Sequence, residues 1–250
     1  MMRPAPVLLS LSLSLSLSGL AACGHDTGFP IRPLPELVVA QPPTAPIAVR
    51  ELVLIPQEKM IWDVQWKGLT IGRVELAVGD DDVHSRFQTG AIVSTMTSVH
   101  HELATALDRA GARPASQHET LVVDGDTRTI DAAFDDAGYR IDDGAPRATP
   151  GVRVHTLHTA LGALRAWARP GAQPGFLTVL VAGEPLRLEL AEPVAEALQD
   201  RPALRIDGRV RGGQQPASIT IWLRAGEDRT PLRIELASET ARVTAELVEP

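Results

Sequence analysis

Cysteine and lysine are almost absent from this chain of 250 residues. Cys23 is the only cysteine, which excludes an internal disulfide. The only lysines are Lys59 and Lys67, so arginine carries nearly all of the positive side-chain charge. The chain contains 24 Lys and Arg residues and 31 Asp and Glu residues, which gives a formal net charge of −7. This balance provides no general electrostatic attraction for nucleic acid, which is therefore not expected as a partner.

Catalytic signatures and long apolar runs are missing as well. The sequence contains no GxSxG, P-loop or GxGxxG motif. Downstream of residue 22, no stretch approaches the roughly 18–20 consecutive apolar residues of a membrane-spanning helix. The sequence therefore identifies no catalytic residue and no cofactor, and it favours a protein that is not an enzyme.

The first 23 residues have the pattern of a bacterial lipoprotein signal. Arg3 precedes an apolar region, Val7 to Leu20, in which leucine and serine alternate, and the sequence LAAC follows, ending at Cys23. A positive start, an apolar region and a small-residue cleavage site are typical of a secretory signal peptide. The LAAC sequence resembles a lipobox, where a peptidase cuts before the cysteine and the thiol carries a diacylglycerol. We expect removal of residues 1–22 and lipidation of Cys23.

Lipidation would place the protein in the cell envelope, facing the periplasm, with the membrane as its partner through Cys23. Each buried CH₂ group contributes about 0.8 kcal/mol, so several acyl chains together anchor a protein firmly. Gly24 follows the cysteine. An aspartate there retains enterobacterial lipoproteins in the inner membrane, so by resemblance Gly24 favours the outer membrane.

Residues 23–56 are interpreted as the lipidated cysteine and a proline-rich tether. Seven prolines lie between Gly24 and Pro56. Proline at this density blocks helices and strand pairing and favours an extended chain. Val49–Ile55 is apolar enough to dock on the domain, but a tether is the preferred interpretation. The folded domain is then residues 57–250.

The domain is predicted to be mainly β. Met60, Trp62, Val64 and Trp66 alternate with polar residues, as in a strand with one buried face. Asp124-Gly125 is a strong hairpin signal. The stretch from Thr95 to Arg109 is less regular and is interpreted as containing a short helix around His101–Ala110. About ten short antiparallel strands around one amphipathic helix predict a curved antiparallel sheet or half-open β-barrel wrapped on that helix, a β-rich α+β fold.

That helix is predicted over Val154–Ala168. At 100° per residue, one face is polar and is expected to meet solvent, with His155, His158, Gly162 and Arg165 on it. The opposite face is apolar and is expected to be buried, and it consists of Val154, Leu157, Ala160, Leu161, Leu164, Trp167 and Ala168.

Several stretches resemble the DUF3108 family of exported proteins. The sequences EKMIWDV at 58–64 and GLTIGRVE at 68–75 resemble its opening strand pair, and Leu157–Trp167 lies where that family has a short helix. ITIWL at 219–223 with PLRIE at 231–235 resembles its closing signature. The resemblance implies a β-rich exported domain without established chemistry. Its architecture is similar to that of periplasmic lipoprotein-sorting proteins, half-open β-barrels that hold acyl chains in an apolar concavity.

Aromatic side chains make up only 4% of the chain, so the tryptophans are the natural candidates for lining an apolar cavity. The alternative is that they form an ordinary core. The predicted lining residues are Trp62, Trp66, Leu157, Leu161, Leu164, Trp167 and Trp222.

Histidines are the candidate zinc ligands, whereas the aspartate clusters at predicted turns lack the EF-hand pattern of a calcium site. His155 and His158 lie one helical turn apart and could supply two ligands to zinc, with a third from His100, His101 or His118. The HxxH spacing lacks the central glutamate of metalloprotease helices. We therefore expect the helix histidines to be solvated, and no metal.

The sequence thus favours a lipid-anchored, non-catalytic binding module for an apolar ligand or an envelope protein. A structural scaffold of the envelope is the alternative, and a metal-assisted hydrolase comes third.

Overall fold

The computed structural model describes residues 43–213 and 216–248, and it confirms a mainly β fold built as one large curved sheet. The first half of the sheet consists of β1 (Lys59–Trp66), β2 (Leu69–Val78), β3 (Asp82–Thr89), β4 (Val99–Asp108), β5 (Arg113–Val123), β6 (Asp126–Phe134), β7 (Gly138–Ile141) and β8 (Arg147–Ala148). The second half consists of β9 (Val154–His155), β10 (Gly175–Val181), β11 (Glu184–Leu190), β12 (Val194–Leu198), β13 (Arg201–Arg211), β14 (Ala217–Arg224), β15 (Pro231–Ala237) and β16 (Arg242–Leu247). The 3₁₀-helix η2 (Val93–Thr95) and the helix α2 (Leu157–Trp167) complete the elements.

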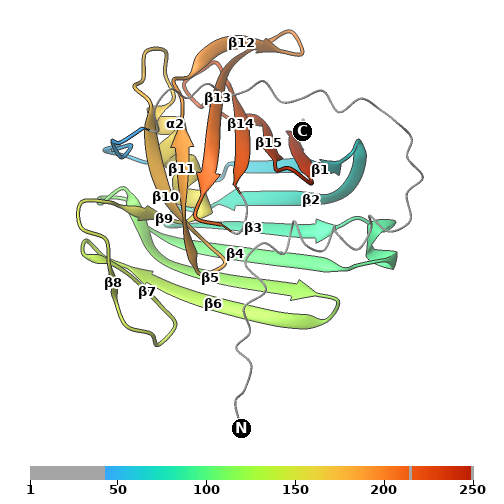
Figure 1. Ribbon diagram of the computed structural model, residues 1–250, viewed down its shortest axis with the longest axis horizontal. Helices are drawn as coiled ribbons and strands as arrows, with labels where there is room; N and C mark the ends of the chain where they lie inside the picture. The colour runs from blue at the N-terminus through green and yellow to red at the C-terminus, as the bar shows by residue number, and fades with distance from the viewer. Residues whose placement is uncertain (1–42, 214–215, 249–250) are drawn as a thin grey trace.

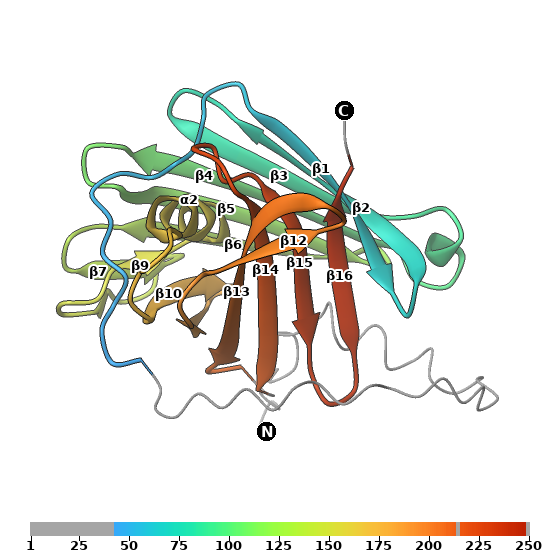
Figure 2. The same cartoon turned by 90° about the horizontal axis from the view of Figure 1, so that it is seen from above.

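The two halves of the sheet meet at the pairing of β1 with β16. The strand order runs from β8 down to β1, then to β16 and on through β15, β14, β13, β11 and β10 to β9, with β12 beside β13. Figure 1 shows β1–β6 nearly horizontal and β10, β11, β13 and β14 nearly vertical, so the halves form two walls that cross. Figure 2 shows α2 enclosed between these walls. In the described part of the chain, no helix has the length and apolar character needed to cross a membrane.

Helix α2 begins at Leu157, three residues later than predicted, because Thr156 caps it. The Thr156 hydroxyl accepts from the backbone N–H of Thr159, and the Thr159 hydroxyl accepts from the N–H of Thr156, which completes a capping box. Val154 and His155 instead form β9, which pairs in parallel with β10.

The predicted division of α2 into a buried and a solvated face is wrong. Gly162, His158 and Arg165 are buried, whereas Leu157, expected inside, is 46% exposed. The reason is that the walls and the segment before β1 cover the helix on several sides. A Cβ atom on Gly162 would lie 2.9 Å from Cγ of Leu54, so this glycine leaves room for that segment.

Residues 43–55, which we call the strap, pack on the domain, so the predicted tether boundary at residue 56 is wrong for this part. The N–H of Ile47 donates to the carbonyl of Phe176 (2.8 Å), and the N–H of Val53 donates to that of Gly162 (3.1 Å). Ile47 and Leu54 are buried in the core. The apolar side chains outweigh the prolines because they bury surface against α2 and β10. The remainder of the predicted tether lies outside the described residues, as do the signal peptide and Cys23.

The predicted hairpin at Asp124-Gly125 is confirmed, and the short helix around His101–Ala110 is wrong. Asp124 (φ 51°) and Gly125 (φ 92°) join β5 to β6 in the left-handed conformation that tight hairpins need. Residues 99–108 form β4, whose ladders with β3 and β5 determine its conformation. Its histidine, glutamate and alanine residues make the strand hard to recognise in the sequence, and pairing with the neighbouring strands outweighs their local preference.

Candidate ligand-binding face

The inner face of the sheet carries rows of apolar side chains that cross the junction of the two walls. In one row, Ile206 pairs with Ile221, Ile221 with Ile234, Ile234 with Ala245 and Ala245 with Val64. Directly paired residues point to the same side of a sheet. Ile206, Ile221 and Val64 are almost fully buried, and the two isoleucines belong to the core cluster that includes Ala163 and Leu164 of α2.

The next row, farther along the strands, is less covered. Ile219 pairs with Leu236, Leu236 with Val243 and Val243 with Trp66. Leu236 is 39% exposed, and the other three are half-buried. The inner face is therefore less covered at this second apolar row, and solvent reaches it at Leu236. An apolar surface of this kind can bind an apolar molecule through exclusion of water.

Buried polar groups occupy the opposite part of the interior, between β3–β5 and the start of α2. Nδ1 of His158 lies 2.9 Å from Oγ1 of Thr105, and Nε2 lies 2.8 Å from Oγ of Ser85. Thr105 donates in turn to Thr156 (3.1 Å). Because the Thr105 hydroxyl donates to Thr156, it accepts from Nδ1–H of His158, and Nε2 then accepts from Ser85.

This arrangement resembles the serine and base of a catalytic site, but the properties of His158 favour a structural role. Burial, with smaller effects from His84 and His101, lowers the pKa of His158 to about 3. A histidine with that pKa is a poor general base at neutral pH. A hydroxyl, not a carboxylate, holds its second nitrogen, so the ring lacks the group that usually stabilises its protonated form.

A second polar group extends from the first along β4 and β5. His101 lies 3.0 Å from the Glu119 carboxylate, and Gln117 donates to the other carboxylate oxygen at 3.0 Å. The register places Glu119 beside Leu103 and His101 beside Leu121, all on the inner face. Gln117 Oε1 and His155 Nδ1 are buried without a hydrogen-bond partner among the described residues. The interior thus combines an apolar wall with polar groups facing it.

The seven predicted cavity residues do not line one space. Trp62 and Leu161 belong to one core cluster, Leu164 and Trp167 to a second, and Trp66 to a third. Leu157 faces outward, and Trp222 lies on the outer face of the sheet. Strand alternation explains the position of Trp222, because its neighbours Ile221 and Leu223 are buried inside while its indole N–H meets Glu196 and Arg233 covers its ring. Trp66 is the member that lies in the accessible apolar row.

The helix histidines are not solvated as predicted. Burial lowers the pKa of His155 to about 4, with a further contribution from the charge of Arg153. His155 is in β9 and not on the helix, so the two rings do not share a helical face. Within the described residues, no group of three His, Cys, Asp or Glu side chains could hold a metal ion.

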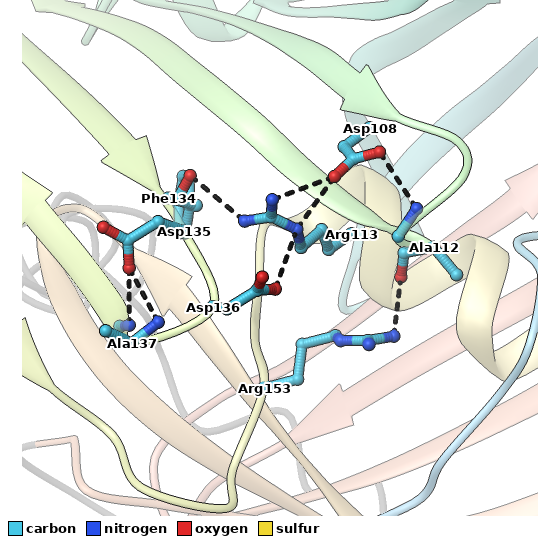
Figure 3. A network of polar contacts seen from close by, with 10 residues as sticks. Asp108, Ala112, Arg113, Phe134, Asp135, Asp136, Ala137 and Arg153 are labelled. Atoms are coloured by element: carbon cyan, nitrogen blue, oxygen red, sulfur yellow. Dashed lines mark hydrogen bonds and ion pairs between the residues drawn. The ribbon is translucent and has the colours of Figure 1, made fainter.

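Figure 3 shows a third polar network, at the turns that join β4 to β5 and β6 to β7. Arg113 lies between the carboxylates of Asp108 (2.9 Å) and Asp136 (3.5 Å), and Arg153 donates to the carbonyl of Ala112 (3.1 Å). The pKa of Asp108 is lowered, chiefly by the hydrogen bond from the N–H of Gly111 and further by Arg113. This network fastens turns to one another, and its central arginine is neutralised.

Comparisons with known proteins identify the fold. No family model matches the chain, and no curated protein matches it. A crystal structure of a β-barrel-like protein of the domain of unknown function DUF1849 from Brucella abortus superposes with a TM-score of 0.56 and 12% identity, over 81% of this chain and 98% of that one. This chain has the fold of that β-barrel-like protein. A DUF1089 family protein from Pseudomonas aeruginosa gives a TM-score of 0.45 and 15% identity, over 67% of this chain and 90% of that one. At these identities the likeness concerns the fold alone.

Proposed function

We propose that this protein is a non-catalytic binding module of the cell envelope, anchored to the membrane through Cys23, whose inner face takes an apolar ligand. The observation that carries the proposal is the accessible apolar row of Ile219, Leu236, Val243 and Trp66. The β-barrel-like fold is compatible with this role. Kinship with the DUF3108 family is part of the same proposal and rests on the sequence resemblance.

Leu236 provides the sharpest test, because the outer face of the sheet offers a matched control. Leu236 is 39% exposed on the inner face, and Ile61 is 37% exposed on the outer face. The protein used would be the mature chain with Cys23→Ser, and the probe N-phenyl-1-naphthylamine, whose fluorescence rises on binding to apolar surfaces. Leu236→Gln should weaken probe binding about fivefold to tenfold, since it removes roughly 1 kcal/mol of apolar contact.

Ile61→Gln also replaces a partly exposed aliphatic side chain by glutamine, but on the outer face. It should leave the affinity for the probe unchanged. Equal weakening by both variants, or none by either, would refute binding on the inner face. Thermal unfolding of both variants would exclude a general loss of structure. The scaffold alternative would be favoured if a protein copurified with the parent chain but not with the Leu236→Gln variant, and if the probe did not displace that protein.

The anchor is tested independently by mass spectrometry of the protein from a bacterial membrane fraction. The amino-terminal peptide should begin at Cys23 and carry the mass of a diacylglycerol. Cys23→Ser should remove that mass and release the protein from the membrane. A wild-type peptide that still contains residues 1–22, or an unmodified cysteine, would contradict the proposed lipidation.

A further inference from the structure

The strap and the carboxyl-terminal end of α2 flank an open cavity of about 810 Å³. The strap is fastened by backbone hydrogen bonds at Ile47 and at Val53. Between these two points Val49 packs against the core, whereas Arg50 and Glu51 are exposed. Residues 45–51 and Val53 form one side of the cavity, and Ala166, Trp167, Arg169 and residues 171–175 form the other. Figure 2 shows the strap passing along the side of the molecule where α2 lies. A cavity of this volume is large enough for a small organic ligand.

Three arginines and one glutamate lie in the lining of this cavity: Arg50, Arg169, Arg229 and Glu51. Among the residues that the structure describes, no carboxylate lies within ion-pair distance of any of the three guanidinium groups. Arg113 in the Figure 3 network, by contrast, is neutralised by two carboxylates. The lining therefore has an excess of positive charge, which an anion would neutralise.

One of these arginines donates a hydrogen bond to the end of α2. The carboxyl-terminal end of a helix carries partial negative charge on its free carbonyls. Arg229 donates to the carbonyl of Arg165 (2.8 Å) and thereby satisfies one of them. This bond also holds the Arg229 side chain in place, whereas the side chains of Arg50 and Arg169 are exposed.

Apolar side chains form the rest of the lining. Trp167 is half-buried, with its indole N–H donating to the carbonyl of Gln173 (3.2 Å), which fixes the ring. Val49 and Pro174 add aliphatic surface. A ligand that matches this lining has an acidic head group, because guanidinium groups bind carboxylate and phosphate through paired hydrogen bonds, and an apolar part to cover the indole.

We propose that the cavity under the strap binds a small amphiphilic anion, with its carboxylate or phosphate against Arg50, Arg169 and Arg229 and its apolar part on Trp167. The site is separate from the inner face described above, so neither proposal depends on the other. A free amphiphile and the head group of an anionic membrane lipid share this chemistry.

The test uses the mature chain with Cys23→Ser and dodecyl phosphate at monomeric concentrations, with binding measured by titration calorimetry. Arg50→Gln/Arg169→Gln should weaken binding about tenfold or more, since two charge-assisted contacts are lost. Arg73→Gln/Arg86→Gln makes the same change in net charge on the outer face, where both arginines are exposed and ion-paired, and should leave the affinity within about twofold of the parent protein. Circular dichroism and thermal unfolding would show that both variants remain folded.

Two further ligands separate the head group from the apolar part. Inorganic phosphate and dodecanol should each bind at least tenfold more weakly than dodecyl phosphate. Equal binding of dodecanol, equal binding of inorganic phosphate, or equal weakening by the two double variants would overturn the proposal. Leu236→Gln should not affect dodecyl phosphate binding, and an effect equal to that of Arg50→Gln/Arg169→Gln would assign the ligand to the inner face and overturn the strap site.

Vesicles distinguish the two sources of the anion. Sedimentation of the protein with phosphatidylglycerol vesicles but not with phosphatidylcholine vesicles, lost in Arg50→Gln/Arg169→Gln, would support a lipid head group. Binding of dodecyl phosphate with no sedimentation on either vesicle would support a free amphiphile. Sedimentation unaffected by the double variant, without binding of dodecyl phosphate, would overturn the proposal.

Discussion

His158 shows how strongly a single side chain depends on its surroundings. Its position on the helix predicts solvent, whereas three hydroxyl-bearing residues and two walls of the sheet enclose it. Thr105 and Ser85, which satisfy its two nitrogens, lie more than fifty positions earlier in the chain. Sequence periodicity contains no information about such distant partners, so the buried polar group could not be predicted from the sequence.

The same burial predicts an acid-sensitive protein. The pKa values of His158 and His155 in the folded protein, about 3 and about 4, lie below the ordinary value of 6.5. Below pH 6.5 the unfolded chain therefore binds more protons than the folded one, and stability falls as the pH falls. Each histidine should remove about 2 kcal/mol of the free energy of unfolding between pH 7.5 and pH 5. Urea denaturation at several pH values measures this loss.

His158→Gln should reduce the pH dependence in that range by about 2 kcal/mol, because glutamine does not titrate. A wild-type free energy of unfolding that stays constant from pH 7.5 to pH 5 would contradict the buried neutral histidines.

Helix α2 is held in place by a buried ion pair that its own sequence does not predict. Arg165 is fully buried and donates from two nitrogens to the carboxylate of Glu58 (2.7 and 3.0 Å), at the start of β1, and from a third to the carbonyl of Asp228 (2.8 Å), between β14 and β15. The helix is thus fixed to both walls of the sheet. Removal of one partner of a buried pair leaves an uncompensated charge, which costs more than loss of the pair itself.

Glu58→Gln should therefore lower the free energy of unfolding by about 3 kcal/mol at pH 7, as measured by urea denaturation. The double variant Arg165→Met/Glu58→Gln should recover part of this loss, because the buried charge is then absent as well. Arg73→Gln, which breaks an exposed ion pair with Asp63, should cost less than about 1 kcal/mol. If Glu58→Gln cost no more than Arg73→Gln, the pair would not fix the helix as described.

Helices and strands were predicted correctly where their sequence patterns are local. The hairpin at Asp124-Gly125 and the strand from Lys59 to Trp66 depend on turn chemistry and alternation, and both are confirmed. β9 and β12 are only two and five residues long, too short for a period to appear. The helix was located correctly within three residues, but its exposed face could not be inferred because the strap that covers it precedes it by a hundred residues.

For the whole molecule, the curved sheet was predictable as a class, but its strand order was not. Alternation of polar and apolar residues predicts that each strand has an inner face, while the pairing of β1 with β16 joins residues about 180 positions apart. The accessible apolar row emerges only from that pairing, because Trp66 and Val243 become neighbours through it. The candidate site therefore depends on the assembled molecule more than on any motif.

The contribution of the strap to the stability of the fold can be measured by truncation. Ile47 and Leu54 are buried, and the apolar transfer energy of two such side chains, reduced by the entropy of ordering the strap, stabilises the fold by about 3 kcal/mol. A chain that begins at residue 43 is the reference, because it keeps the whole strap. A chain that begins at residue 57 keeps Glu58 but loses the strap, and it should be less stable by about that amount. Equal stability of the two truncated chains would mean that residues 43–56 act only as a tether, as their prolines suggest.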